Sequence, residues 1–201
     1  MPFAIAQKLE MTRVFDTEGR AFPATKVKLV TVKVSSLLLT EKVGYDAVQV
    51  EIVREDDKIV KKPFRAEFRV TDPKEFKMDE VIKYGDIVSG DTITIVGKGK
   101  GKGFAGVIKR HGFHRGPMGH GSNHHRAPGS IGGGYPQRVV AGRKMPGRLG
   151  GKGVTFANMQ VLDIDVKNSI MLIKGSVPGP RNAKIKIMVT KQNKVEEVAA
   201  E

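Results

Sequence analysis

Residues 92–103 read Thr-Ile-Thr-Ile-Val-Gly-Lys-Gly-Lys-Gly-Lys-Gly. The first five residues are all β-branched, which is typical of a β-strand because branched side chains pack well on a pleated surface. The alternating Gly and Lys that follow give no apolar side chain to a core. We therefore expect a strand to end at Val96 and a basic segment of a different kind to begin at Gly97.

This basic segment lies inside a longer stretch without acids. From Thr92 to Leu162, 71 residues contain no Asp or Glu, but they contain twelve Lys or Arg and all five histidines. The whole chain carries +14, so this stretch supplies most of the charge. Bases without nearby acids must find their anions on a partner, and phosphate is the obvious one. Gly97–Gly153 also holds 18 of the 24 glycines. Such a composition cannot build its own core, so we expect the segment to become ordered against nucleic acid.

Both flanks of the basic segment read as strands. Short β-rich runs separated by turn signals occur at Phe3–Phe15, Arg20–Val34, Tyr45–Val53, Met159–Val166, Ser169–Lys174 and Lys184–Val189. One helix start is suggested, at Asp72-Pro73-Lys74-Glu75, where an acid precedes a Pro at the first helical position. The apolar residues after it fit a helical stripe only loosely, so the spacing leaves this helix open.

Many short strands at regular spacing favour a barrel, because closure removes exposed sheet edges. The predicted fold is mainly β, with a small closed β-barrel body, a long basic Gly-rich loop extension and little helix. The body is expected at 1–96 and 154–190, the extension at 97–153, and a polar C-terminal tail at 191–201. With the extension removed, the length suits one domain with a single core.

Several classes of function are disfavoured by composition. The chain has no cysteine, so disulfides and thiolate metal sites are impossible, which fits a reducing compartment. The N-terminus shows no signal sequence, and no run reaches the ~18 to 20 apolar residues that span a bilayer. A basic amphipathic helix on a membrane is incompatible with the glycine content. We expect a soluble, intracellular protein.

Three site patterns have plain competing interpretations. Gly101–Gly106 matches the dinucleotide pattern G-x-G-x-x-G, but the true fingerprint opens a helix and has an acid ~20 residues later. Here Val107-Ile-Lys-Arg-His-Gly follows, and no acid occurs before Asp163. No Gly-Lys precedes Ser or Thr, so a P-loop is absent. The five histidines lack Cys, Asp or Glu to complete a zinc site. Ser122 has no nearby acid to orient a base for hydrolysis.

A family resemblance rests on blocks that follow one another in order. They are Lys8–Phe15 (KLEMTRVF), Gly101–Gly106 (GKGFAG), Lys109–Phe113 (KRHGF), Gly119–Ser122 (GHGS), His125–Gly132 (HRAPGSIG), Gly142–Arg148 (GRKMPGR) and Lys174–Pro180 (KGSVPGP). Together they resemble the universal family of third large-subunit ribosomal proteins, in its shorter bacterial form. The match covers nearly the whole chain.

The resemblance implies a β-barrel body on the outside of the large ribosomal subunit, in the cytoplasm. It implies an extension that threads through the large ribosomal RNA toward the peptidyl transferase centre, and early binding near the 3′ end of that RNA. Neighbouring large-subunit proteins would be further partners, with no cofactor, metal, membrane or small-molecule substrate. Two departures stand out. Glu10 replaces a usual Gly, so a local contact is expected to differ, and Gln137 lies beyond Pro136, so a family glutamine methylation is not carried over.

The resulting hypothesis is a non-enzymatic RNA-binding protein of the large subunit. Its expected RNA contacts are Lys8, Arg13, Lys98, Lys100, Lys102, Phe104, Lys109, Arg110, His111, Phe113, His114, Arg115, His120, Ser122, His124, His125, Arg126, Ser130, Arg138, Arg143, Lys144, Arg148 and Lys152. Its expected tip is Gly129, Ser130, Ile131, Gly132, Gly133, Gly134 and Tyr135. Lys and Arg would neutralise phosphates, and His and aromatic rings would contact bases and riboses. The alternatives are a free-standing nucleic-acid chaperone or architectural binder and a nucleotide-using enzyme at Gly101–Gly106.

Overall fold

The computed structural model describes residues 2–16, 18–53, 64–82 and 87–191. The chain divides into two compact units: a body, Met1–Lys98 with Gly153–Glu201, and an extension, Gly99–Lys152. Strands dominate, and the described residues form only two short α-helices and one 3-10 turn. The prediction of a mainly β fold with little helix is therefore confirmed. Of the predicted tail, 191–201, all but Lys191 lies outside the described residues.

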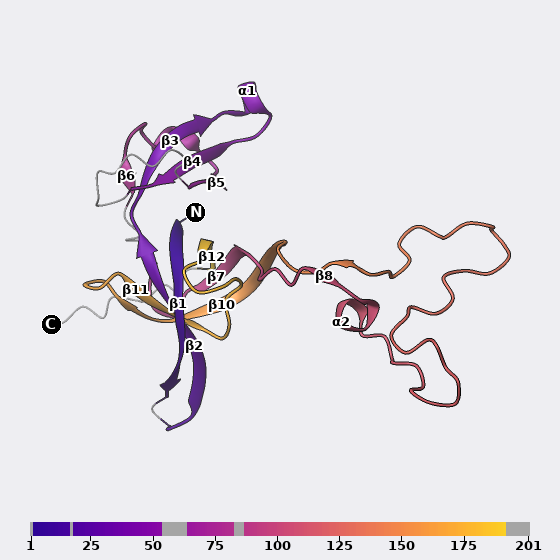
Figure 1. The fold of residues 1–201 in the computed structure, drawn as a ribbon. Coiled ribbons are helices and arrows are strands. Elements are labelled where there is room, and N and C mark those ends of the chain that lie inside the picture. The colour runs from indigo at the N-terminus through magenta and orange to yellow at the C-terminus, as the bar shows by residue number, and fades with distance from the viewer. Residues whose placement is uncertain (1, 17, 54–63, 83–86, 192–201) are drawn as a thin grey trace. The chain divides into compact units, whose positions relative to one another are not determined.

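Six strands of the body pair in a closed ring (Figure 1). They are β1 (Phe3–Phe15), β2 (Ala21–Val30), β7 (Thr92–Lys98), β10 (Gly153–Asp165), β11 (Ile170–Lys174) and β12 (Lys184–Lys191). The order is β1-β12-β7-β10-β11-β2, β2 returns to β1, and every pair is antiparallel. Lys98 and Gly153 are partners in the β7–β10 ladder. The chain therefore leaves the body and re-enters it at paired positions.

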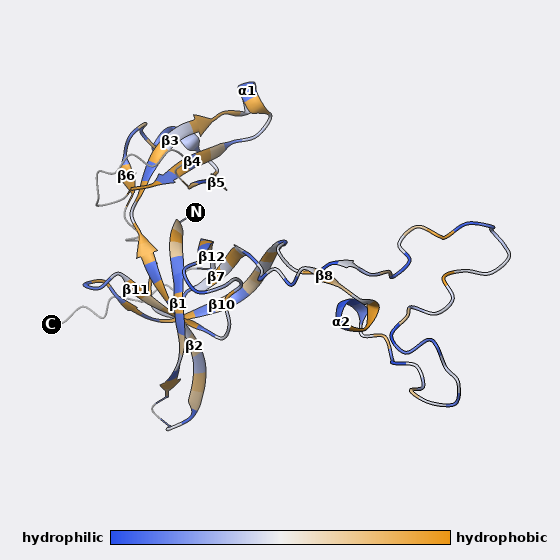
Figure 2. Ribbon diagram, in the orientation of Figure 1, coloured by the Kyte–Doolittle hydropathy of each residue, from blue (hydrophilic) through white to orange (hydrophobic). Residues whose placement is uncertain are grey.

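Alternate residues of each strand fill this ring. Ile93 and Ile95 of β7 and Ile185 and Ile187 of β12 are completely buried in one apolar cluster. The residue between the first two, Thr94, is half-buried. Successive side chains of a strand point to opposite faces, so the period-two pattern in the sequence places one set in the core. Figure 2 shows the same concentration of apolar residues on the body strands.

A second sheet belongs to the body. It contains β3 (Val32–Leu38), β4 (Ala47–Ile52), β5 (Arg65–Arg69) and β6 (Val81–Ile82) in the order β5-β4-β3-β6, with α1 (Thr40–Val43) between β3 and β4. Its apolar cluster includes Phe3 and Ile5 of β1. The rings of Phe3 and Phe68 stack with centroids 4.3 Å apart. Ala4 and Ala6 of β1 lie instead in the cluster of the ring. The prediction of a single core is thus wrong, because β1 is apolar on both faces and serves two clusters.

The helix left open after Asp72 is only a 3-10 turn, η1 (Pro73–Glu75). Phe76, the next residue, is extended and packs against the second apolar cluster. Asp79 has φ of 65°, a left-handed value that an α-helix cannot include. Tertiary packing of Phe76 therefore overrides the local helix signal of the Asp-Pro pair.

Candidate nucleic-acid interface

The two ends of the extension run together as a narrow stem, which we define as residues 99–111 and 144–152. The Gly99 N–H donates to the Lys152 carbonyl and the Lys102 N–H to the Leu149 carbonyl, both at 2.9 Å. Two short strands, β8 (Phe104–Ala105) and β9 (Gly147–Arg148), continue this pairing. The Gly-Lys repeat is therefore one side of a hydrogen-bonded ribbon whose lysine side chains are exposed.

Glycine is required in the stem by the chain itself. Gly150 has φ of +71°, and a Cβ there would overlap the carbonyl oxygen of Lys100. Only a residue without a side chain permits both this left-handed conformation and so close an approach of two backbones. Glycine at this position therefore lets the two sides of the stem approach each other.

A short helix, α2 (Val107–His111), follows the dinucleotide-like pattern. Gly106 is its N-terminal cap, and Gly112, with φ of 71°, ends it by donating its N–H to the Ile108 carbonyl at 2.9 Å. The helix removes one of the two reasons for rejecting a dinucleotide site at Gly101–Gly106. The other reason stands, because no acid occurs before Asp163 to bind a ribose.

Several expected RNA contacts are used to hold the extension in shape. Arg110 Nη1 donates to the Met145 carbonyl at 2.6 Å, and His111 Nε2 bonds to the same oxygen at 3.0 Å. These two contacts join α2 to the returning side of the stem. Sequence reasoning missed this role because nothing in the sequence indicates that the carbonyl of residue 145 accepts these hydrogen bonds.

Farther along, two more of these residues make contacts within the extension. Arg143 Nη2 donates to the Ser130 carbonyl at 2.8 Å, and the Ser130 hydroxyl donates to the Gly132 carbonyl at 2.9 Å. These bonds tie one end of the predicted tip to the returning chain. All seven tip residues are exposed, and Tyr135 is 91% exposed.

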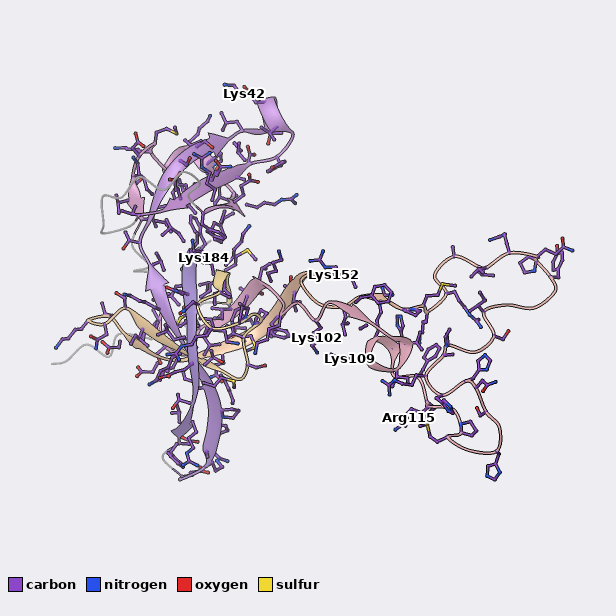
Figure 3. The ribbon with its side chains drawn as sticks, viewed as in Figure 1. Lys42, Lys102, Lys109, Arg115, Lys152 and Lys184 are labelled. Atoms are coloured by element: carbon purple, nitrogen blue, oxygen red, sulfur yellow. The ribbon has the colours of Figure 1, made fainter. Side chains whose placement is uncertain are left out.

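Most of the expected contact residues are exposed along the extension (Figure 3). The exposed members are Lys98, Lys100, Lys102, Phe104, Lys109, His114, Arg115, His120, His124, Arg126, Ser130, Arg138, Arg143, Lys144, Arg148 and Lys152. Arg110, His111, Phe113, Ser122 and His125 are half-buried. The extension has no carboxylate, so its cations have no ion-pair partner within their own unit. Phe104 is 81% exposed, which leaves a planar ring available for stacking.

The two RNA contacts expected in the body, Lys8 and Arg13, differ in their exposure to solvent. Lys8 is half-buried and its Nζ donates to the carbonyls of Val177 and Gly179, at 2.6 and 3.1 Å. It stabilises the Pro-rich turn before β12. Arg13 is exposed, with its guanidinium carbon 5.8 Å from the centroid of the Phe15 ring.

Glu10, where the resembled family usually has Gly, makes contacts of its own. Its carboxylate lies 3.7 Å from Lys26 Nζ and 3.9 Å from Arg181 Nη2. The register of β1 against β2 shifts between Lys8 and Met11, so Glu10 lies at this irregularity. The acid thus links two basic side chains where a glycine would leave them apart. Both pairs are solvent-exposed and contribute little stability.

Three alternative interpretations concern a metal site, a catalytic serine and a membrane helix. Within the described residues, no group of three or more His, Cys, Asp or Glu is placed to hold a metal ion. Ser122 is half-buried, and no acid occurs in its unit to orient a histidine. None of the described helices has the length and apolar character needed to cross a membrane.

The sequence was compared with protein families and with known proteins. The sequence model of the family Ribosomal protein L3 matches residues 70–167. The protein named large ribosomal subunit protein uL3 from Desulforudis audaxviator (strain MP104C) is 39% identical over 193 residues, which cover 89% of this chain and 91% of that protein. The protein of that name from Heliobacterium modesticaldum (strain ATCC 51547 / Ice1) is 41% identical over 191 residues, or 88% and 91% of the two chains. Its namesake from Prochlorococcus marinus (strain NATL2A) is 38% identical over 205 residues, or 94% and 93%. With such identity over nearly its full length, the chain belongs to the ribosomal protein L3 family.

Proposed function

We propose that this chain is a structural constituent of the large ribosomal subunit, in which its extension binds the large-subunit RNA. As a member of a family of non-enzymatic ribosomal proteins, it takes part in translation without performing a reaction. The observation that carries the proposal is the acid-free extension, on which nearly all Lys and Arg side chains are exposed. A partner rich in phosphate supplies the anions that these cations lack within their own unit.

The two units take different parts in this proposal. The body, 1–96 with 154–190, acts as a closed barrel that holds the ends of the extension in register on the outside of the subunit. The extension, 97–153, follows the RNA, with its Lys and Arg on phosphates and with Phe104 and Tyr135 stacked on bases or riboses. The family resemblance supports binding near the 3′ end of the RNA, an early role in assembly, and contacts with neighbouring ribosomal proteins.

The tip, Gly129–Tyr135, is proposed to lie near the peptidyl transferase centre. It contains no Asp, Glu, Lys, His or Cys, so it has no general base for work near neutral pH. Its role there would be one of shape. A Cβ at Gly132 would meet only the Arg138 carbonyl oxygen, at 3.8 Å, so the chain itself has room for a side chain. Any requirement for glycine at this position would therefore come from RNA.

Replacement of the extension tests the proposal. Because Lys98 and Gly153 are ladder partners, an Asn-Gly turn between them would close β7 and β10 as a two-residue hairpin and leave the body intact. We expect the unaltered chain to sediment quantitatively with the large subunit after a high-salt wash, and the shortened chain to be washed off. Circular dichroism of the shortened chain checks that the body folds.

The same experiment distinguishes this proposal from the alternative of a free-standing nucleic-acid binder. A free-standing chaperone or architectural binder has the same need for charge and glycine, but it would remain in the supernatant after the wash. Recovery of the unaltered chain mainly outside the subunit would therefore favour that alternative. Full retention of the shortened chain would place the principal RNA contacts on the body.

A further inference from the structure

The distal part of the extension contains a pocket of about 640 Å³. Its walls come from residues 111–117, from Ser122, His124 and 127–129, and from Lys144 on the returning chain. The exposed cations at the pocket are Arg115 and Lys144, and the planar side chains are His111, Phe113, His114 and His124. No acid occurs anywhere in the unit that forms it.

The pocket is held open by contacts between segments that are close in sequence but fold back on each other. The Gly116 N–H donates to the His125 carbonyl at 3.0 Å, and His125 Nδ1 bonds to the Pro117 carbonyl at 2.9 Å. A Cβ at Gly116 would overlap the carbonyl oxygen of His124. The bond of His111 to the Met145 carbonyl holds a third side of the pocket. Hydrogen bonds within the extension therefore stabilise the walls of the pocket.

The size and chemistry of the pocket suit a single nucleotide. A volume of this order is typical of small-molecule sites and is too small for a base-paired duplex. Planar rings offer stacking surfaces to a base, and Arg and Lys offer positive charge to its phosphate. Lining by Pro117, Ala127 and Pro128 adds apolar surface, which phosphate alone would not require.

We propose that this pocket receives one unpaired nucleotide of the large-subunit RNA, extruded from its helix. The base lies among Phe113, His114 and His124, and its phosphate lies near Arg115 and Lys144. This inference rests on the proposed function, because it assumes that the extension is embedded in RNA. It goes beyond charge neutralisation, since the extension would then select an RNA structure with a base free to leave the stack.

Chemical probing of reconstituted large subunits tests the pocket. One set would carry His114→Ala with His124→Ala, and another Arg115→Gln. The controls are Asn123→Ala and Lys42→Gln, which change exposed residues that neither line the pocket nor belong to the expected RNA contacts. We expect the histidine pair to raise the base reactivity of one unpaired nucleotide by roughly five- to hundredfold, the range implied by loss of base stacking. Arg115→Gln removes only a charge near the phosphate, so it should raise the reactivity of the same base less. The controls should leave reactivity unchanged.

A variant that keeps flat rings sharpens the result. His114→Phe with His124→Phe retains two stacking surfaces and should keep most of the protection that the alanine pair loses. Equal base reactivity in all subunits, or altered backbone cleavage without altered base reactivity, would overturn the proposal while leaving RNA binding intact. Protection that depends on a neighbouring ribosomal protein would point to a peptide occupant and would overturn it too. Loss of the unaltered chain from washed subunits would contradict the proposed function and this inference together.

Discussion

The body and the extension differ in how their charged side chains are paired and in how many apolar side chains they bury. In the body, Lys33 pairs with Asp79 at 2.9 Å and Arg65 with Glu51 at 3.1 Å, and apolar side chains fill two clusters. In the extension there is no acid, and Ala105 and Val107 are the buried apolar residues. Arg110 and Arg143 turn instead to carbonyl oxygens. We therefore expect the body to be stable alone and the extension to be completed by a partner that brings anions and surface.

The largest effect that tests this contrast is on RNA affinity. Six exposed cations, five in the extension and one at the end of β7, would be replaced with Gln. This change should flatten the salt dependence of RNA binding. The six are Lys98, Lys100, Lys102, Lys109, Arg148 and Lys152. Neutralising six to ten phosphates corresponds to a loss of ~10³ to 10⁵ in affinity between 50 and 200 mM salt. Titration of a 3′ fragment of the large-subunit RNA at several salt concentrations measures this slope.

A matched set of substitutions on the body controls for net charge. It replaces Lys28, Lys42, Lys74, Lys77, Lys167 and Lys191 with Gln, all of them exposed. This set should leave the slope nearly unchanged, because its cations are not proposed to meet phosphates. Equal flattening by both sets would mean that the binding is a property of total charge and would break the distinction between the units.

Next in size is the effect of removing an isoleucine side chain. Ile95 is completely buried in the ring, so Ile95→Ala should lower the free energy of unfolding by about 2–5 kcal/mol. Ile131 is 40% exposed at the tip, and Ile131→Ala should change it by less than about 0.5 kcal/mol. Urea unfolding of the free protein, followed by circular dichroism, measures both. Similar losses would show that the tip contributes to the stability of the folded chain.

A smaller effect distinguishes the stem from the rest of the extension. Gly150→Ala forces a left-handed alanine, at roughly 1–2 kcal/mol, and also pushes its Cβ against the Lys100 carbonyl. Gly142→Ala carries the same backbone strain at φ of +82°, but nothing lies within 4 Å of the new Cβ. Hydrogen exchange at the amides of Gly99 and Lys102 should therefore accelerate in the first variant and not in the second.

Limited proteolysis gives a second readout of the same difference. In the free protein we expect cleavage to concentrate in the extension, because fixing a glycine-rich chain costs ~1–2 kcal/mol of backbone entropy per residue. Sites between Arg115 and Arg143 should be cut first, and Gly150→Ala should add sites at Lys100 and Lys102. Cleavage spread evenly over body and extension would contradict the division of the chain.

The sequence was most informative where local chemistry decides structure. The β-branched run at 92–96 predicted a strand, although β7 continues two residues beyond the predicted end, to Lys98. The missing acids predicted a separate segment, and Gly99–Lys152 forms a compact unit of its own. The second apolar cluster was not predictable, because it depends on β1 presenting Phe3 and Ile5 to a sheet formed by later residues. The pocket and the Arg110–Met145 contact were not predictable either, since both depend on hydrogen bonds to backbone carbonyls that no residue type reveals.

A still smaller effect is expected at His125 and at the tip. His125 bonds to the Pro117 carbonyl and Ser130 to the Gly132 carbonyl, so their side chains serve local structure. His125→Ala or Ser130→Ala should change single-turnover peptide transfer on reconstituted subunits by less than about tenfold, which is ~1.4 kcal/mol in the barrier. A bulky residue at Gly132 should instead disturb assembly or the response to antibiotics at the centre. A thousandfold loss from His125→Ala, with normal assembly, would mean that the protein supplies a catalytic group.

The smallest effect concerns pH and belongs to the body alone. The side chain and then the backbone N–H of Asn168, at 2.6 and 3.2 Å, donate to the Asp165 carboxylate and lower its pKa below the usual 3.8. A carboxyl whose pKa is lowered by folding stabilises the native state above its unfolded pKa, and this contribution is lost as the pH falls through the folded value. As the pH is lowered from 6 to about 3, the Tm of the unaltered protein should thus fall slightly more steeply than that of Asp165→Asn. Replacing the extension with the Asn-Gly turn should leave this difference unchanged, because no carboxylate is removed with residues 99–152. A difference that vanished with the extension would show that the two units share their acid response, contrary to the contrast drawn between them.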